Sequence, residues 1–194
     1  MTINIDIFSD YVCPYCLLFE AAVSEAGRDL DIQINWQPVE LRPYPNPTLR
    51  PEDDYLPAVW KASVYPLAEQ LDVPLKLPSI SPQPYSRLAH EGAQFAALAG
   101  QSDAYNARIF SAFFQEDRDI GDLDVLTSLA GELGLDAKEF RAALESGRFT
   151  AAHNGALQAA AERGIHSVPS VWINDQPVPL TYDAKTLRSL LQSL

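Results

Sequence analysis

Cys13 and Cys16, the two cysteines of this 194-residue chain, lie three positions apart in the stretch SDYVCPYCLLFE. On a helix this spacing separates the two Cβ atoms by about 5–6 Å. A small adjustment then reaches the roughly 4 Å that a disulfide requires. Because a disulfide across so short a loop constrains the unfolded chain little, it would contribute little stability. The spacing therefore favours redox chemistry over structural reinforcement.

Two other interpretations of the cysteine pair are a zinc half-site and two inert buried thiols. A structural zinc site needs about four ligands and usually a second cysteine pair, which the sequence lacks. The three histidines, His90, His153 and His166, show no ligand spacing, so we expect no metal site. Free cysteine is often simply buried, and the inert pair stays open as an alternative.

The residues after the first cysteine predict how the pair is oriented. The segment from Leu17 to Ala26 is apolar and ends at Gly27, which is typical of a helix with a glycine stop. Cys13 would then lie at the helix N-terminus, where free N–H groups and the helix dipole favour a thiolate. Cys16, one turn deeper, is expected to be less exposed and less acidic. We therefore predict that Cys13 attacks and Cys16 resolves the mixed disulfide.

Hydrophobic periodicity predicts the elements around this helix. Alternating apolar residues indicate strands at residues 3–8 and 30–41. Two short strands are expected around an Asn174-Asp175 turn, followed by a last helix over about 183–193. Between these parts, helical patterns occur near residues 55–71, 85–99, 102–116, 122–133, 136–145 and 149–163, with Asp122 and Asp136 as N-cap candidates and Gly100 and Gly134 near helix ends.

The order of these elements is β-α-β, a helical block, then α-β-β-α. It predicts an α/β fold interrupted by an all-helical insertion domain. We expect a discontinuous α/β domain formed by residues 1–50 and 149–194. Residues 51–148 would form the insertion, and the proline-rich stretch RPYPNPTLRPEDD marks its beginning.

Composition and charge narrow the classes of partner. The formal net charge is -12, from 14 basic and 26 acidic residues, which argues against nucleic-acid binding. The sequence contains no run of about eighteen apolar residues, so we expect no membrane span. The first residues lack the pattern of a signal peptide, so we expect a cytoplasmic protein. In that compartment disulfides are usually catalytic or redox-sensing.

Two motifs together resemble the thioredoxin-like superfamily: CPYC opening the first helix and SVPSVWI entering a late strand. The stretches PVELRPYP, PYSRLAHEGAQFA and AAAERGIHSVPSVWIN narrow the resemblance to the DsbA family, and within it to the FrnE-like group. Kappa-class glutathione transferases and 2-hydroxychromene-2-carboxylate isomerases are relatives of that group. The resemblance implies a thioredoxin-like fold in which the Val168–Pro169 bond is cis and faces the cysteines, and its backbone binds substrate.

The resemblance also implies a set of site residues. The catalytic residues would be Cys13 and Cys16, with Pro14 and Tyr15 between them and Pro169 opposite. Residues expected to contact substrate are Val168, Ser167 and Tyr11, although Tyr11 could equally belong to the core. Members of the superfamily often hold a buried acid near the pair as proton acceptor, which makes Asp6 the candidate proton relay; an exposed strand carboxylate is the alternative.

The expected function is thiol–disulfide exchange without a metal or organic cofactor. The partner would be a protein or small molecule that carries a disulfide or dithiol. Because the dipeptide Pro14-Tyr15 is typical of glutaredoxins, dithiol chemistry with glutathione as co-substrate stays open. The alternative is a glutathione-dependent transferase or isomerase of the kappa-class type, in which one cysteine acts alone on small electrophiles. A redox-inert binding or chaperone-like module stays open as well, as does the choice between monomer and homodimer.

Overall fold

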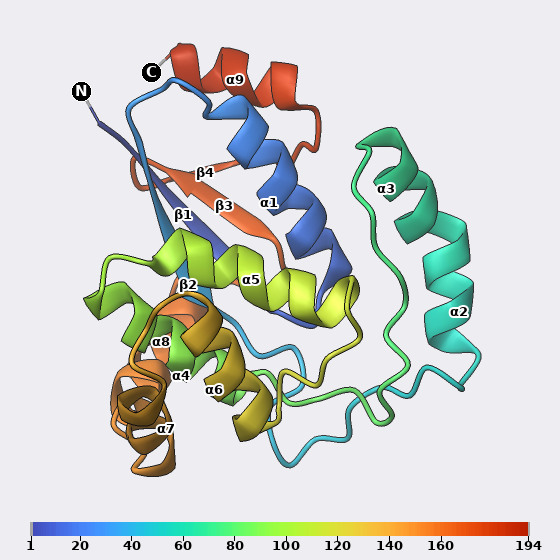
Figure 1. Cartoon of the computed structure of the whole chain (residues 1–194). Coiled ribbons are helices and arrows are strands. Elements are labelled where there is room, and N and C mark those ends of the chain that lie inside the picture. Colours follow the sequence, from blue (N-terminus) through green and yellow to red (C-terminus); the bar gives the residue numbers. More distant parts are fainter. Residues whose placement is uncertain (1, 194) are drawn as a thin grey trace.

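A four-stranded mixed sheet forms the framework of the molecule, with the strand order β2–β1–β3–β4. The computed structural model describes residues 2–193, and Figure 1 shows the sheet behind helix α1. The first two strands are parallel and the remaining pairs are antiparallel. The strands are β1 (Ile3–Ser9), β2 (Ile32–Pro38), β3 (Ser170–Ile173) and β4 (Gln176–Val178).

Helix α1 (Pro14–Ala26) makes the crossover that the parallel pair β1 and β2 requires. Pro14 occupies its first turn, where the missing N–H of proline removes no helical hydrogen bond. Cys13 precedes it as an extended N-cap residue. The predicted helix therefore begins directly after the first cysteine.

The two faces of the sheet are covered by different helices. Ile5 and Ile7 pack with residues of α1 and of α9 (Ala184–Gln192) in one core. Successive side chains of a strand point to opposite faces, so Asp6 and Phe8 face the other side, where α8 (Thr150–Glu162) lies. The cysteines, at the start of α1, therefore lie on one face of the sheet, and α8 covers the other face.

A block of helices lies between β2 and α8. Asp122 and Asp136 cap two of them as predicted, because their carboxylates accept backbone N–H bonds of the first turn. Gly100 and Gly134, which have positive φ, follow helix ends. The block consists of α2 (Tyr55–Val59), a π-helix (Trp60–Val64), α3 (Tyr65–Gln70), α4 (Arg87–Leu98), α5 (Ser102–Phe114), α6 (Leu123–Glu132) and α7 (Ala137–Glu145).

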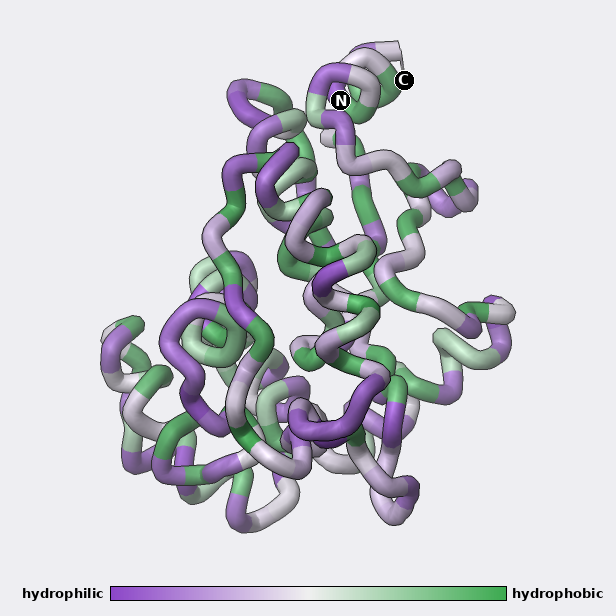
Figure 2. Tube along the Cα trace, turned by 90° about the vertical axis from the view of Figure 1, so that its right-hand side faces the viewer, coloured by the Kyte–Doolittle hydropathy of each residue, from purple (hydrophilic) through white to green (hydrophobic). Residues whose placement is uncertain are grey.

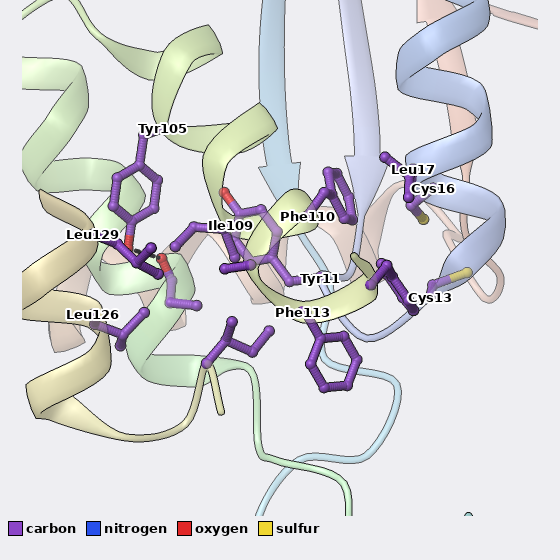
Figure 3. Close-up of a cluster of buried hydrophobic side chains, with 14 of the residues drawn as sticks. Tyr11, Cys13, Cys16, Leu17, Tyr105, Ile109, Phe110, Phe113, Leu126 and Leu129 are labelled. Atoms are coloured by element: carbon purple, nitrogen blue, oxygen red, sulfur yellow. Dashed lines mark hydrogen bonds between the residues drawn. The ribbon is translucent and has the colours of Figure 1, made fainter. Parts of the chain in front are cut away.

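The helical block has its own hydrophobic core, and both cysteines belong to it. Tyr11, Cys13, Cys16 and Leu17 pack with buried residues of the block, and Figure 3 shows the cysteines at one end of this cluster. Polar and apolar residues alternate at short intervals along the trace (Figure 2), so helices present one face to a core and another to solvent. Within residues 2–193 no helix has the length and apolar character to cross a bilayer. The α/β order with an inserted helical block is confirmed.

Candidate active site around Cys13 and Cys16

The turn between β1 and α1 places both thiols at the start of the helix. The Cys13 amide donates to the carbonyl of Asp10, and the Cys16 amide donates to the carbonyl of Cys13, each at 3.0 Å. Both cysteines are free thiols, and their exposed fractions are 5% for Cys13 and 1% for Cys16. Figure 3 shows Cys13 at the start of α1 and Cys16 on the first turn of the helix. The deeper thiol is therefore the more buried one, as predicted.

The segment before β3 meets the first cysteine. The Cys13 thiol lies 3.8 Å from the carbonyl oxygen of Val168 and directs a weak hydrogen bond to it. The Val168–Pro169 peptide bond is cis, and Pro169 has no N–H to offer the sulfurs. Residues 155 positions apart in the chain thus form one site.

The surroundings of Cys16 favour its neutral form. Burial raises the pKa of the Cys16 thiol well above its ordinary value, and the neighbouring Cys13 side chain raises it further. A backbone hydrogen bond at Asp10 and the Ser9 hydroxyl lower the pKa of Cys16, but by less than burial raises it. At neutral pH Cys16 is therefore a thiol and must lose a proton before it can act as a nucleophile.

A cavity of about 250 Å³ opens beside Cys13. Pro14, Tyr15 and Val168 line it together with Cys13. The Tyr15 hydroxyl is 2.5 Å from the Ser63 hydroxyl of the π-helix, which links this wall to the helical block. The rest of the lining includes the apolar side chains of Leu49, Leu56, Val59 and Trp60 and the polar side chains of Gln83 and Ser86.

Two of the expected substrate contacts lie elsewhere. Tyr11 is buried on the far side of the loop, where its ring packs 4.6 Å from His90 and 5.2 Å from Phe110. It does not line the cavity beside Cys13, because it fills the core between the loop and the helical block. Ser167 is exposed, and its carbonyl accepts a bond from the Ser170 hydroxyl. Of the residues expected to contact substrate, Val168 lines the cavity beside Cys13, whereas Tyr11 and Ser167 do not.

Asp6 lies on the wrong face of the sheet for the role expected of it. Its carboxylate accepts hydrogen bonds from Arg163 at 2.9 Å and from Asn35 at 3.1 Å. Because side chains alternate along β1, Ile5 and Ile7 point toward α1 while Asp6 points toward α8. This placement does not support a proton relay between Asp6 and Cys16.

The buried acid next to the cysteines is Asp10, which sequence reasoning missed. Its side chain is fully buried, and its carboxylate accepts a hydrogen bond from the Leu41 amide at 2.7 Å. The other carboxylate oxygen is 3.6 Å from His90 Nε2. Its position three residues before the first cysteine was the available signal, but its partners are distant in sequence.

Two buried histidines continue this polar cluster away from the cysteines. His90 and His153 stack with ring centroids 5.7 Å apart. His153 Nε2 lies 2.7 Å from a carboxylate oxygen of Glu40, and Glu40 also pairs with Arg87 at 3.0 Å. A row of buried carboxylate and imidazole side chains thus runs from the cysteine loop to α8. It ends at the partly exposed side chain of Arg87.

Tyr182, in the segment before α9, is a second neighbour that sequence reasoning missed. Burial raises the pKa of its hydroxyl, and negative charge on Cys13 and Cys16 raises it further. Its ring packs edge-on against Phe19 of α1. No local pattern marks this tyrosine, because only the docking of α9 on α1 brings it near the thiols.

No group of three or more histidine, cysteine or acidic side chains within residues 2–193 is arranged to hold a metal ion.

Comparison with known proteins places this geometry in a family. The chain is 44% identical over 181 residues to the uncharacterized protein YwbO of Bacillus subtilis, covering 92% of this chain and 90% of that protein. It is 25% identical over 182 residues to the 2-hydroxychromene-2-carboxylate isomerase of Pseudomonas putida, covering 89% and 86% of the two chains. The fold is similar to that of the cytosolic disulfide reductase DsbM of Pseudomonas aeruginosa in its structure with GSH, with a TM-score of 0.76, 17% identity, and 98% of each chain covered.

Residues 4–194 match the family described as DSBA-like thioredoxin domain. The match spans the sheet, the cysteine pair and the helical block, which agrees with the fold class expected from the sequence. The chain belongs to the DsbA-like thioredoxin domain family.

Proposed function

We propose that this protein is a thiol–disulfide oxidoreductase in which Cys13 is the nucleophile and Cys16 the resolving thiol. The observation that carries the proposal is the asymmetry of the pair. Cys13 lines the cavity and lies 3.8 Å from the Val168 carbonyl, whereas Cys16 is buried one turn behind it. Cys13 is the N-cap residue of α1, the end of a helix where the helix dipole favours negative charge.

In the first step, the Cys13 thiolate attacks one sulfur of a substrate disulfide. A new S–S bond forms at Cys13, the substrate disulfide breaks, and its second sulfur leaves as a thiolate that takes a proton from solvent. The cavity walls formed by Tyr15 and Val168 hold the substrate group next to the sulfur. The Val168 carbonyl is an available acceptor for a backbone N–H of a polypeptide substrate.

In the second step, Cys16 loses its proton and attacks the sulfur of Cys13. The Cys13–Cys16 bond forms, the remaining substrate sulfur leaves as a thiolate, and two electrons have passed from the dithiol to the substrate. The raised pKa of Cys16 keeps this thiol protonated until then. The same steps in reverse oxidise a dithiol substrate, and no metal or organic cofactor takes part.

The partner class is a protein or small molecule that carries a disulfide or dithiol, with glutathione as co-substrate. Two observations support glutathione: the Pro14-Tyr15 dipeptide between the cysteines, and the similarity of the fold to DsbM, whose structure contains GSH. DsbM is a cytosolic disulfide reductase, and a cytoplasmic location for this chain is part of the proposal.

A second candidate function is a glutathione-dependent isomerase or transferase. It is favoured by the 25% identity to 2-hydroxychromene-2-carboxylate isomerases and by the mainly apolar wall of the cavity. In that reaction Cys13 would act alone, so Cys16→Ser would leave activity unchanged. Disulfide exchange instead requires both thiols.

Trapping with oxidised glutathione distinguishes the two functions. We expect Cys16→Ser to accumulate a mixed disulfide with one glutathione at Cys13, and the parent chain to proceed to its own disulfide. Mass spectrometry of acid-quenched samples measures both products. Cys13→Ser is the matched control and should react slowly, because Cys16 is buried. A parent chain that ends as the glutathione adduct contradicts the proposal.

A further inference from the structure

A second chamber lies behind the active site, on the other side of Tyr11. It has a volume of about 250 Å³ and lies between β2, α4 and α5. Ser9 and Tyr11 line its inner end, and Ala97, which is exposed, belongs to its outer lining. Cys13 lines the front cavity, whereas this rear chamber begins at the residue that ends β1. The chamber is thus a separate space that reaches from solvent toward the cysteine loop.

Three polar side chains in this rear chamber have no hydrogen-bond partner within the part of the chain that the structure describes. They are Ser9, His90 and Asn106, through the atoms Oγ, Nε2 and Nδ2. Their exposed fractions are 4%, 6% and 2%. Because buried polar groups are nearly always hydrogen-bonded, three such groups around one space indicate a polar occupant. The volume accommodates several water molecules.

The inner end of the rear chamber reaches the resolving thiol. Ser9 follows Ile5 and Ile7 on the face of β1 that packs against α1, so its side chain points toward the helix that holds Cys16. Its hydroxyl lowers the pKa of the Cys16 thiol without a hydrogen bond of ordinary geometry. The other groups that face Cys16 are the Asp10 backbone, Cys13 and Tyr182. Of these neighbours, Ser9 is the one that also lines the rear chamber.

We propose that the rear chamber carries the proton of Cys16 to and from solvent, with the Ser9 hydroxyl as its first station. This inference rests on the thiol–disulfide exchange proposed above. In the second step the Ser9 oxygen accepts the Cys16 proton while its own hydroxyl proton passes to water held by His90 and Asn106. The Cys16 thiolate then forms the bond to Cys13. On reduction of that disulfide, Cys16 leaves as a thiolate and the proton returns by the same route.

The arrangement of the two spaces explains why a rear route is needed. When Cys13 carries a substrate group, that group occupies the front cavity and blocks the way from Cys16 to solvent on that side. The rear route does not cross the substrate. His90 can hold a water of this route because its ring is fixed in position. It packs between Tyr11 and His153, and its Nε2 lies 3.6 Å from the Asp10 carboxylate.

The test uses dithiobis(nitrobenzoate), an aromatic disulfide that releases one coloured thiolate in each step. The first phase of colour reports the attack by Cys13 and the second reports the resolution by Cys16; Cys16→Ser defines the second phase by removing it. Ser9→Ala removes the hydroxyl, and Ala93→Leu fills the rear chamber from α4 without changing a polar atom. Ala152→Leu, on an exposed position of α8, is the control.

The expected result is a second phase slowed by about 100-fold in Ser9→Ala, the lower end of what a positioned proton-transfer group contributes. Ala93→Leu should slow it in the same direction, while Ala152→Leu matches the parent. The ratio of second-phase rates in H2O and D2O should also change in Ser9→Ala, which a loss of packing alone does not produce. Thermal unfolding checks that each variant is folded.

A second phase that is unchanged in either Ser9→Ala or Ala93→Leu overturns the rear route. A parent chain that shows no second phase overturns the exchange reaction itself, and the route with it. The two failures are therefore distinguishable in one experiment.

Discussion

The buried carboxylate of Asp10 and the imidazole of His90 lie 3.6 Å apart directly behind the cysteine loop. The same carboxylate accepts the Leu41 amide at 2.7 Å, so it fixes the loop against the segment that follows β2. Asp10 therefore connects the position of the thiols with the joint between the sheet and the helical block.

Replacing Asp10 should destabilise the fold more than replacing Asp6. Asp10→Ala removes the fully buried carboxylate that accepts the Leu41 amide, and losing a hydrogen bond to such a group costs about 1–3 kcal/mol of unfolding free energy. Asp6→Ala removes a partly exposed pair with Arg163, and such pairs contribute about 1 kcal/mol or less. Urea unfolding of both variants measures the difference. If both variants lose the same unfolding free energy, the hydrogen bond of Asp10 to Leu41 does not stabilise the fold more than the surface pair does.

The stability of the reduced protein should fall as pH rises above about 8.5, the ordinary value for a cysteine thiol. Burial raises the pKa of Cys16 in the folded state, so above that pH the unfolded chain loses a proton that the folded chain retains. The loss approaches about 1.4 kcal/mol per pH unit. Urea unfolding under reducing conditions between about pH 7.5 and 9.5 measures it.

The control for this pH dependence is Cys16→Ala, which removes the titrating thiol. Its unfolding free energy should depend less steeply on pH over the same range. If parent and variant lose stability with the same slope, the buried thiol is not the cause.

Enlarging a side chain in the front cavity should discriminate between substrates. Val59 is half-buried and lines the same cavity as Cys13, so Val59→Trp reduces the space for a bulky disulfide. We expect KM to rise for a bulky aromatic disulfide, with little change for a small aliphatic one. Steady-state kinetics with both substrates measure the ratio. Lys61→Trp, on the exposed side of the π-helix, is the matched control; an equal rise in that variant would contradict the assignment of the cavity.

Several helices and strands were predictable because their signals are local. Alternating isoleucines indicate β1, and Asp122 and Asp136 mark helix starts by capping chemistry that involves only neighbouring residues. The π-helix at Trp60–Val64 was not predicted, because the spacing of apolar residues over 55–71 is compatible with one regular helix.

The site was predictable where chain order determined it and unpredictable where packing did. The positions of Cys13 and Cys16 follow from the strand, the turn and the helix. In contrast, the burial of Asp10 depends on the Leu41 amide 31 positions away and on His90 in the helical block. For Asp6 the local pattern already argued against a proton relay. Because side chains alternate along β1, Asp6 lies on the face opposite α1.

The most direct test of the proposed function is equilibration of the reduced protein in glutathione buffers, followed by quantification of the Cys13–Cys16 disulfide. We predict a reversible two-electron transition, in which a tenfold change in the equilibrium constant corresponds to about 30 mV. A midpoint near about -270 mV would assign the role of a reductant, and one near about -120 mV that of an oxidant. If no reversible intramolecular disulfide forms at any buffer ratio, the exchange mechanism is contradicted.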